Sequence, residues 1–244
     1  MKKSDAIRLE PLGGGLEIYI SGACSFGTDA VLLADFAAPK PGDAACDLGT
    51  GCGIIPLLWQ KGPGPAHTVG VEIQPEACLL AERSVARNGC GDRVQIANAD
   101  LRYLPAEWKG GFDLITCNPP YFTDKFRKSP DPLRAAARTE GMCTLWDVLS
   151  AAERLLRPSG RFCFCQRPGR LEEAMRGLIQ AGLYLNRLRF ISHRPEKPPF
   201  LFLAEAGRRP GFSLLPHLFL ETDGEPSAEY KRIYRDFFPA SPLH

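Results

Sequence analysis

The tetrapeptide Asn118-Pro119-Pro120-Tyr121 follows the apolar run Phe112-Asp113-Leu114-Ile115-Thr116-Cys117, which has the composition of a buried strand. A residue before proline is pushed towards extended backbone and proline lacks an N–H, so the chain leaves this strand stiffly with its carbonyl groups exposed. The amide oxygen of Asn118 and the carbonyl of Pro119 are then placed to accept hydrogen bonds from both N–H groups of a planar amine. Tyr121 is placed to stack on the ring or amide plane that carries this amine. The nitrogen lone pair stays free to attack an electrophilic methyl group. The motif predicts Asn118, Pro119, Pro120 and Tyr121 as catalytic residues, although an isolated Asn-Pro usually only ends a strand as a turn.

A glycine-rich segment, Cys46-Asp47-Leu48-Gly49-Thr50-Gly51-Cys52-Gly53, links a strand pattern to a helix-compatible run at 54–59. Its glycines, Gly49, Gly51 and Gly53, let backbone pass close to a ligand ahead of a helix N-terminus, as in nucleotide-binding βαβ units. The spacing Gly-x-Gly-x-Gly differs from the dinucleotide fingerprint, and the carboxylate of Asp47 repels a pyrophosphate. A cationic cofactor fits better, because Asp47 attracts the sulfonium and ammonium groups of S-adenosylmethionine.

Two further acidic residues end the next two predicted strands. Glu72 lies about 20 residues beyond the glycine segment, the spacing of the ribose-binding acid in βαβ nucleotide sites. We expect Glu72 to accept hydrogen bonds from ribose hydroxyls and Ile73 to offer adenine an apolar face. Asp100 is placed to accept from the adenine amine, with Leu101 packed on the ring. One strand-end acid is often only a helix cap, but three at successive strand ends predict one binding site.

Together these motifs resemble the class I S-adenosylmethionine-dependent methyltransferases, and among them the bacterial tRNA(1)(Val) adenine-37 N(6)-methyltransferase family. The similarity extends from about residue 7 to about residue 234. Further segments that carry it are Phe26-Gly27-Thr28-Asp29-Ala30-Val31-Leu32-Leu33-Ala34, Gly70-Val71-Glu72-Ile73-Gln74, Ala137-Arg138-Thr139-Glu140, Leu155-Leu156-Arg157-Pro158-Ser159-Gly160-Arg161-Phe162 and Arg187-Leu188-Arg189-Phe190.

The resemblance implies N(6)-methylation of an adenine in tRNA, at position 37 of the anticodon loop, with S-adenosylmethionine as the methyl donor. It also implies that Phe26, Gly27, Thr28 and Asp29 close over the methionine end of the cofactor. The family usually has Ala-Arg-His-Glu where this chain has Thr139 in the third position, so a substrate contact by that histidine is not carried over.

Two other functions share some of these features. Glutamine N(5)-methyltransferases acting on peptide release factors also have Asn-Pro-Pro-Tyr, since a carboxamide is another planar NH2 group. They typically carry a separate helical N-terminal substrate domain, and only about forty residues precede the cofactor loop here, which weakens this alternative. A non-catalytic RNA-binding module would predict damaged motifs, whereas Asp47, Glu72, Asp100 and Asn118 are all present.

The segment after the motif, at about 122–142, carries basic and aromatic side chains and is expected to be a substrate-facing loop. Cationic side chains attract phosphates, and aromatic rings stack on unpaired bases. Acidic residues within the segment dilute its charge, so a solvated charged loop is the alternative. The predicted substrate-binding residues are Tyr121, Phe122, Lys125, Arg127, Lys128 and Arg138.

A second set of basic residues surrounds the last predicted strands. It is either another RNA contact or the solvent-exposed face of an edge strand. With a formal net charge of only +2, the chain is no general polyanion binder, and recognition of tRNA would need a local patch. The second group consists of Arg187, Arg189, His193, Arg194, Lys197, Arg208 and Arg209.

The alternation of strand and helix patterns predicts one α/β methyltransferase domain over 1–244, with an N-terminal hairpin and helix at about 7–38. The expected fold is Rossmann-like, a mostly parallel seven-stranded sheet with a C-terminal antiparallel hairpin and helices on both faces. Right-handed crossovers then place the site residues along the carboxyl edge of the sheet. The predicted strands are 7–10, 16–20, 44–48, 67–73, 93–100, 112–117, 161–166, 184–191 and 200–206, and the predicted helices are 29–39, 54–59, 76–88, 145–157 and 171–181.

Composition fits this prediction, with 44% hydrophobic and 24% charged residues among 244. No apolar run is long enough to cross a bilayer and the first residues lead into no signal-peptide core, so we expect a cytoplasmic protein with no membrane partner. The nine cysteines fall on predicted strands and helices without a Cys-x-x-Cys or cysteine–histidine cluster, which predicts reduced thiols and no metal site. The sequence carries no sign of the oligomeric state.

Overall fold

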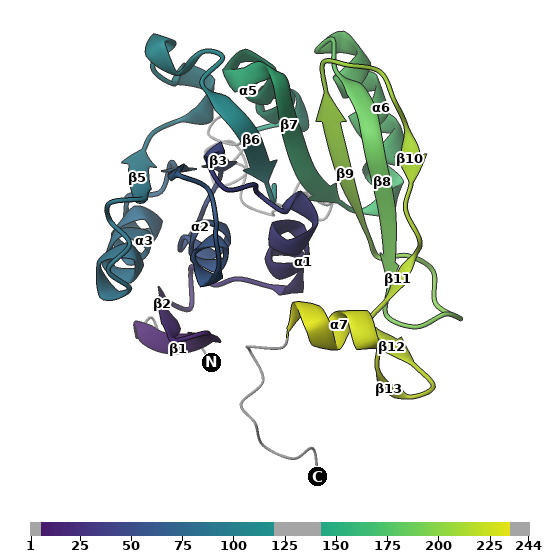
Figure 1. Ribbon diagram of the computed structural model, residues 1–244, viewed down its shortest axis with the longest axis horizontal. Helices are drawn as coiled ribbons and strands as arrows, with labels where there is room; N and C mark the ends of the chain where they lie inside the picture. The colour runs from purple at the N-terminus through teal and green to yellow at the C-terminus, as the bar shows by residue number, and fades with distance from the viewer. Residues whose placement is uncertain (1–5, 120–142, 235–244) are drawn as a thin grey trace, which may run out of the picture.

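A computed structural model of the chain describes residues 6–119 and 143–234 (Figure 1). Nine strands form one sheet in the order β10-β8-β9-β7-β6-β3-β4-β5, with β11 also paired to β8. Strands β5, β4, β3, β6 and β7 are mutually parallel, and β9 runs antiparallel to both β7 and β8. The strands are β3 (Ala44–Leu48), β4 (His67–Glu72), β5 (Val94–Asn98), β6 (Phe112–Cys117), β7 (Leu156–Gln166), β8 (Tyr184–Ser192), β9 (Leu201–Gly207), β10 (Ser213–Leu214) and β11 (Leu218–Phe219).

This arrangement confirms the predicted parallel sheet with its closing antiparallel hairpin, and adds two short strands to the seven expected. Strands β10 and β11 pair with the outer side of β8, so β8 is not the edge strand that the sequence suggested. Strand β7 also begins earlier than predicted, because Leu156 already pairs with Phe112 directly after the preceding helix ends.

Helices cover both faces of the sheet, as predicted. On one face, α1 (Thr28–Ala37), α2 (Ile54–Leu58) and α3 (Pro75–Arg87) bury a core that includes Leu33 and Leu57. On the other face, α5 (Leu145–Leu155) and α6 (Leu171–Gln180) bury a core that includes Phe162 and Phe164. The 3₁₀ turns in the described ranges are η1 (Trp59–Lys61), η2 (Leu101–Tyr103), η3 (Ala106–Trp108) and η5 (Pro168–Arg170).

The N-terminal hairpin, β1 (Arg8–Gly13) and β2 (Leu16–Ile20), is held against α3. The backbone N–H of Tyr19 donates to Ser84 Oγ at 2.9 Å, and that of Glu17 donates to Asn88 Oδ1 at 2.9 Å. Asn88 Nδ2 returns a hydrogen bond of 2.7 Å to the carbonyl of Glu17. These contacts fix the start of the segment that leads from β2 to α1.

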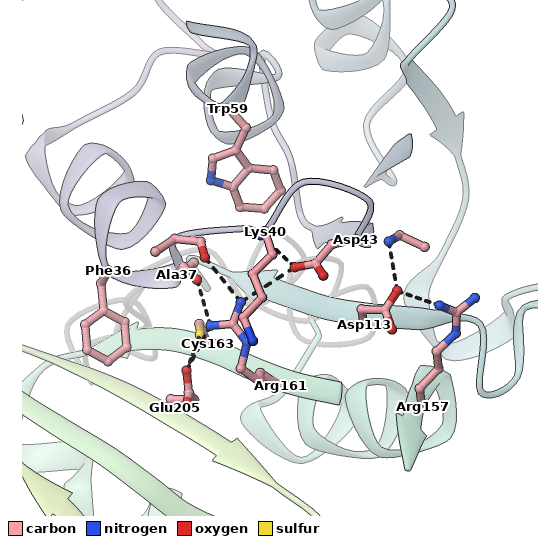
Figure 2. A network of polar contacts seen from close by, with 12 residues as sticks. Phe36, Ala37, Lys40, Asp43, Trp59, Asp113, Arg157, Arg161, Cys163 and Glu205 are labelled. Atoms are coloured by element: carbon pink, nitrogen blue, oxygen red, sulfur yellow. Dashed lines mark hydrogen bonds and ion pairs between the residues drawn. The ribbon is translucent and has the colours of Figure 1, made fainter. Parts of the chain in front are cut away.

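A polar network ties α1 to the sheet (Figure 2). The Arg161 guanidinium on β7 donates to the carbonyl of Ala37 at 2.9 Å, and to Glu205 Oε2 on β9 at 3.2 Å. Nearby, the carboxylate of Asp113 accepts from the backbone N–H of Ala44 at 3.0 Å and from Arg157 at 2.5 Å. The last carbonyls of a helix carry partial negative charge. Arg161 therefore satisfies both the C-terminal end of α1 and the carboxylate of Glu205 on β9.

The chain continues past β11 into β12 (Glu221–Thr222), β13 (Glu225–Pro226) and α7 (Ala228–Ile233), none of which the sequence patterns predicted. Helix α7 is held by paired charges. Arg232 contacts both carboxylate oxygens of Asp35 on α1, at 2.8 and 2.9 Å. Arg189 on β8 contacts both oxygens of Glu229 on α7, at 2.8 and 2.7 Å. None of the helices in the described ranges is long and apolar enough to span a membrane.

Candidate functional site

The carboxyl ends of β3, β4, β5 and β6 border a cavity of about 580 Å³. This volume lies within the range of about 300–1,000 Å³ that is usual for small-molecule sites. The predicted residues on its wall are Phe26, Gly27, Asp47, Gly49, Gly51, Glu72, Ile73, Asp100, Leu101, Asn118 and Pro119.

Three predicted cofactor residues lie off this wall. Helix α1 begins at Thr28, so its first turn brings Ala30 to the cavity instead of Thr28 or Asp29. The carboxylate of Asp29 lies 3.8 Å from the Arg167 guanidinium. Gly53 caps the start of α2 in a left-handed conformation and is also set back from the wall.

Seven predicted residues lie outside the described ranges, and the structure leaves their roles as predictions. They are Pro120, Tyr121, Phe122, Lys125, Arg127, Lys128 and Arg138.

The glycine loop follows β3 and is anchored to the neighbouring strand. Gly49, Gly51 and Gly53 have φ values of 72°, 57° and 85°, in the left-handed region that favours glycine. The backbone N–H groups of Gly49 and Thr50 both donate to the carbonyl of Val71, at 2.8 and 2.9 Å. The loop therefore has one defined conformation at the mouth of the cavity.

Glu72 at the end of β4 links this loop to the next turn of the chain. Its Oε2 accepts from the backbone N–H of Gly51 at 2.9 Å, and its Oε1 accepts from the backbone N–H of Gln74 at 3.0 Å. The side chain is buried but lines the cavity. Oε1 also accepts a longer contact of 3.5 Å from Gln74 Nε2, so Oε2, with one hydrogen bond here and two lone pairs, is the oxygen better able to accept from a ligand.

Asp47 is almost completely buried, with 2% of its surface exposed. The hydroxyl of Thr116, its register partner on β6, donates to Asp47 Oδ1 at 2.7 Å. Burial raises the pKa of Asp47 to about 7, against the opposing effect of the Thr116 hydrogen bond, and the charge of Glu72 adds to the rise. A cation in the cavity would favour the ionised form, because opposite charges at short range stabilise each other.

Asp100 is paired with Arg102, a cavity residue that the sequence patterns did not single out. Two nitrogens of the guanidinium contact Asp100 Oδ2 at 3.0 and 2.5 Å, and the backbone N–H of Arg102 donates to Oδ1 at 2.9 Å. This pairing lowers the pKa of Asp100. The adenine contact predicted for Asp100 therefore has to share the carboxylate with Arg102.

Asn118 and Pro119 lie at the end of β6 on the same cavity wall as Asp47. The amide Oδ1 of Asn118 accepts a hydrogen bond from the thiol of Cys165 on β7, with a sulfur–oxygen distance of 3.0 Å. Neither Cys165 nor Thr116 belongs to a sequence motif. Their contacts with Asn118 and Asp47 follow only from the order and register of the strands.

None of the nine cysteines forms a disulfide, and seven are buried, which confirms the expectation of free thiols. Cys117, directly before the motif, is buried, and burial raises its thiol pKa well above the usual range. It is therefore a poor nucleophile. Within residues 6–119 and 143–234, no three His, Cys, Asp or Glu side chains group as metal ligands.

Comparison with known proteins identifies the family. Residues 39–182 match the family model described as a methyltransferase domain. The chain is also 32% identical over 223 residues to the tRNA1(Val) (adenine(37)-N6)-methyltransferase of Parabacteroides distasonis, a match that covers 88% of this chain and 91% of the relative. The chain belongs to this methyltransferase family. The methyltransferase of the same name from Yersinia enterocolitica is 30% identical, over 88% of this chain and 86% of its own length.

Solved structures agree on the methyltransferase fold. A predicted O-methyltransferase of Agrobacterium tumefaciens superposes with a TM-score of 0.67 at 18% identity, over 86% of this chain and 97% of its own. A geranyl diphosphate C-methyltransferase from Streptomyces coelicolor, solved with S-adenosyl-L-homocysteine, gives a TM-score of 0.55 at 14% identity, over 74% and 79% of the two chains. The chain is a methyltransferase by family and by fold, and its buried carboxylates beside a glycine loop would suit a cationic nucleoside cofactor such as S-adenosylmethionine.

Proposed function

We propose that this enzyme methylates the exocyclic N6 of an adenine in tRNA, at position 37 of the anticodon loop, in the cytoplasm. The observation that carries the proposal is that Asn118 and Pro119 line the same cavity as Asp47 and Glu72. An acceptor pair for an amine thus lies beside a site suited to a cationic methyl donor. The tRNA and the position come from the names of the relatives, which the chain matches over most of their length.

When bound, the cofactor supplies an activated methyl group. We assign Asp47 to its cationic end, Glu72 to the ribose hydroxyls, and Ile73 and Leu101 to the two faces of adenine. Asp47 reaches the cavity from β3, and Glu72 is fixed by two backbone hydrogen bonds, so these groups are oriented before the cofactor arrives. Such preorganisation reduces the ordering cost of binding.

At the substrate side, the Oδ1 of Asn118 and the carbonyl of Pro119 each accept a hydrogen bond from one N–H of the adenine amine. The nitrogen lone pair of that amine is delocalised into the ring, and two acceptors favour the pyramidal nitrogen that can attack the methyl group. Fixing both reactants in line contributes up to about 7–11 kcal/mol. Tyr121 and the segment 122–142, outside the described residues, are proposed to hold the base and the neighbouring phosphates.

A base in a loop is also the less costly target. Extruding a base from a duplex costs on the order of a few kcal/mol, and a base that is already unpaired avoids part of that cost. This preference favours an anticodon loop over duplex DNA.

The test is transfer of labelled methyl from S-adenosylmethionine into purified bacterial tRNA, with a peptide release factor as parallel substrate. We expect N6-methyladenosine at position 37 by nucleoside mass spectrometry, and loss of about 100-fold or more of kcat in Asn118→Ala, a loss typical of removing an oriented hydrogen-bonding group from a reaction centre. Binding of S-adenosyl-L-homocysteine should be retained in that variant. If only the release factor is labelled, the proposed tRNA substrate is wrong and the enzyme methylates a glutamine side chain.

A further inference from the structure

Cys165 lies next to the proposed catalytic amide although it belongs to no motif. It is completely buried on β7, and its Sγ lies 3.0 Å from Oδ1 of Asn118, which directly follows the neighbouring strand β6. Strands β6 and β7 are paired in parallel up to Cys117 and Phe164, so the next residue of each strand is brought side by side by the register alone.

The direction of this hydrogen bond has a chemical consequence. The thiol is the donor, and so it selects the orientation of the carboxamide in which Oδ1 faces Cys165. A carboxamide oxygen has two lone pairs, and the thiol takes up one of them. In the flipped orientation Nδ2 would take the place of Oδ1, and an NH2 group of a carboxamide cannot accept a hydrogen bond from an amine.

We propose that Cys165 is a positioning residue for methyl transfer: its thiol holds the Asn118 amide in the orientation whose oxygen, and not its NH2 group, can accept a hydrogen bond from the target amine. The proposal rests on the proposed function, because it assumes that Asn118 accepts from the amine. Cys165 acts through Asn118 and forms no bond to the substrate.

The chain offers a matched control on the same strand. Cys163 is also completely buried and lies two residues earlier, so its side chain is on the same face of β7. Its Sγ lies 3.8 Å from Glu205 Oε2, in the network that ties α1 to the sheet (Figure 2). A substitution at Cys163 therefore makes a similar cavity without touching Asn118.

The kinetic test compares Cys165→Ala, Cys165→Ser and Cys163→Ala in full-length enzyme. Cys165→Ala should lower kcat by about five- to tenfold, the value of one lost hydrogen bond, with the KM values for tRNA and cofactor changed less than about twofold. Cys165→Ser keeps an O–H donor and should recover most of the loss. Cys163→Ala should retain the wild-type kcat. An unchanged kcat in Cys165→Ala, an equal loss in Cys163→Ala, or no recovery with serine would each overturn the proposal.

Infrared spectroscopy tests the hydrogen bond without any substrate. The S–H stretching band that disappears in Cys165→Ala identifies this thiol, and it should move towards the frequency of a free thiol in Asn118→Ala. A band that does not move in Asn118→Ala would refute the contact. If wild-type enzyme labels the release factor and not tRNA, the proposed substrate fails while the same kinetic comparison proceeds with the release factor.

Discussion

At the scale of single residues, we expect Asp47 to make cofactor binding depend on pH. Burial raises its pKa to about 7, and a cationic ligand favours the carboxylate, so binding below neutral pH must displace a proton. We expect the affinity for S-adenosylmethionine to rise about tenfold from pH 5.5 to pH 7. Calorimetric titration at a series of pH values measures this directly.

Two variants separate Asp47 from other titrating groups. Asp47→Asn should bind more weakly at pH 7 and lose the rise with pH. Thr116→Val removes the hydrogen bond that favours the ionised carboxylate, so the midpoint of the rise should move to higher pH. A rise of equal size in Asp47→Asn would show that another group is responsible.

The residues predicted from the sequence are those that a local pattern marks. Asp47, Glu72 and Asn118 stand at strand ends next to a glycine loop or prolines, and the structure places all three on one cavity wall. Arg102 and Cys165 were missed because their importance depends on what they touch. Cys165 meets Asn118 only through the pairing of β6 with β7, which a reading along the chain does not provide.

At the scale of elements, the close approach of β4 to the glycine loop depends on Gly70. A Cβ at Gly70 would lie 2.9 Å from Thr50 Cγ2 and 3.0 Å from Ile96 Cδ1. Both neighbours are β-branched and have little rotamer freedom. We expect Gly70→Ala to lower the free energy of unfolding by about 1–3 kcal/mol and to weaken cofactor binding by displacing Thr50 within the loop.

Gly91→Ala is the control for this change, since a Cβ there meets nothing within 4 Å and the backbone is not left-handed. Urea unfolding and titration with S-adenosyl-L-homocysteine should show Gly91→Ala close to wild type. Equal effects of the two substitutions on binding would mean that the contact with Thr50 does not shape the loop.

The limits of prediction at this scale have a physical cause. Long elements such as α5 bury residues at helical spacing, with Leu145, Val148, Leu149, Ala152 and Leu155 all inside, and that period is visible in the sequence. Strands β10 and β11 contain two residues each, too few to show any period. They form because β8 offers an unpaired side for backbone hydrogen bonds.

At the scale of the whole molecule, the distribution of basic side chains distinguishes the two clusters considered for RNA binding. In the cluster around the last strands, four arginines pair with carboxylates of the chain: Arg187 with Glu205, Arg189 with Glu229, Arg194 with Glu221 and Arg208 with Glu153. These pairs join strands and helices to one another. Much of their charge is therefore offset within the chain, although Glu205 is shared between Arg187 and Arg161.

Because four of the seven basic residues of this cluster pair with carboxylates of the chain, we expect the segment after the motif to supply most phosphate contacts. Replacing Lys125, Arg127 and Lys128 together by alanine should raise the KM for tRNA and flatten its salt dependence. Each phosphate contact contributes about 0.7 to the slope of log affinity against log salt for single strands, so three contacts would change the slope by about 2. Arg194→Ala, which breaks an internal pair with Glu221, should leave that slope as in wild type. An equal change of the salt-dependence slope in Arg194→Ala would mean that tRNA competes with Glu221 for this arginine. The surface that binds tRNA would then extend to the C-terminal end of β8.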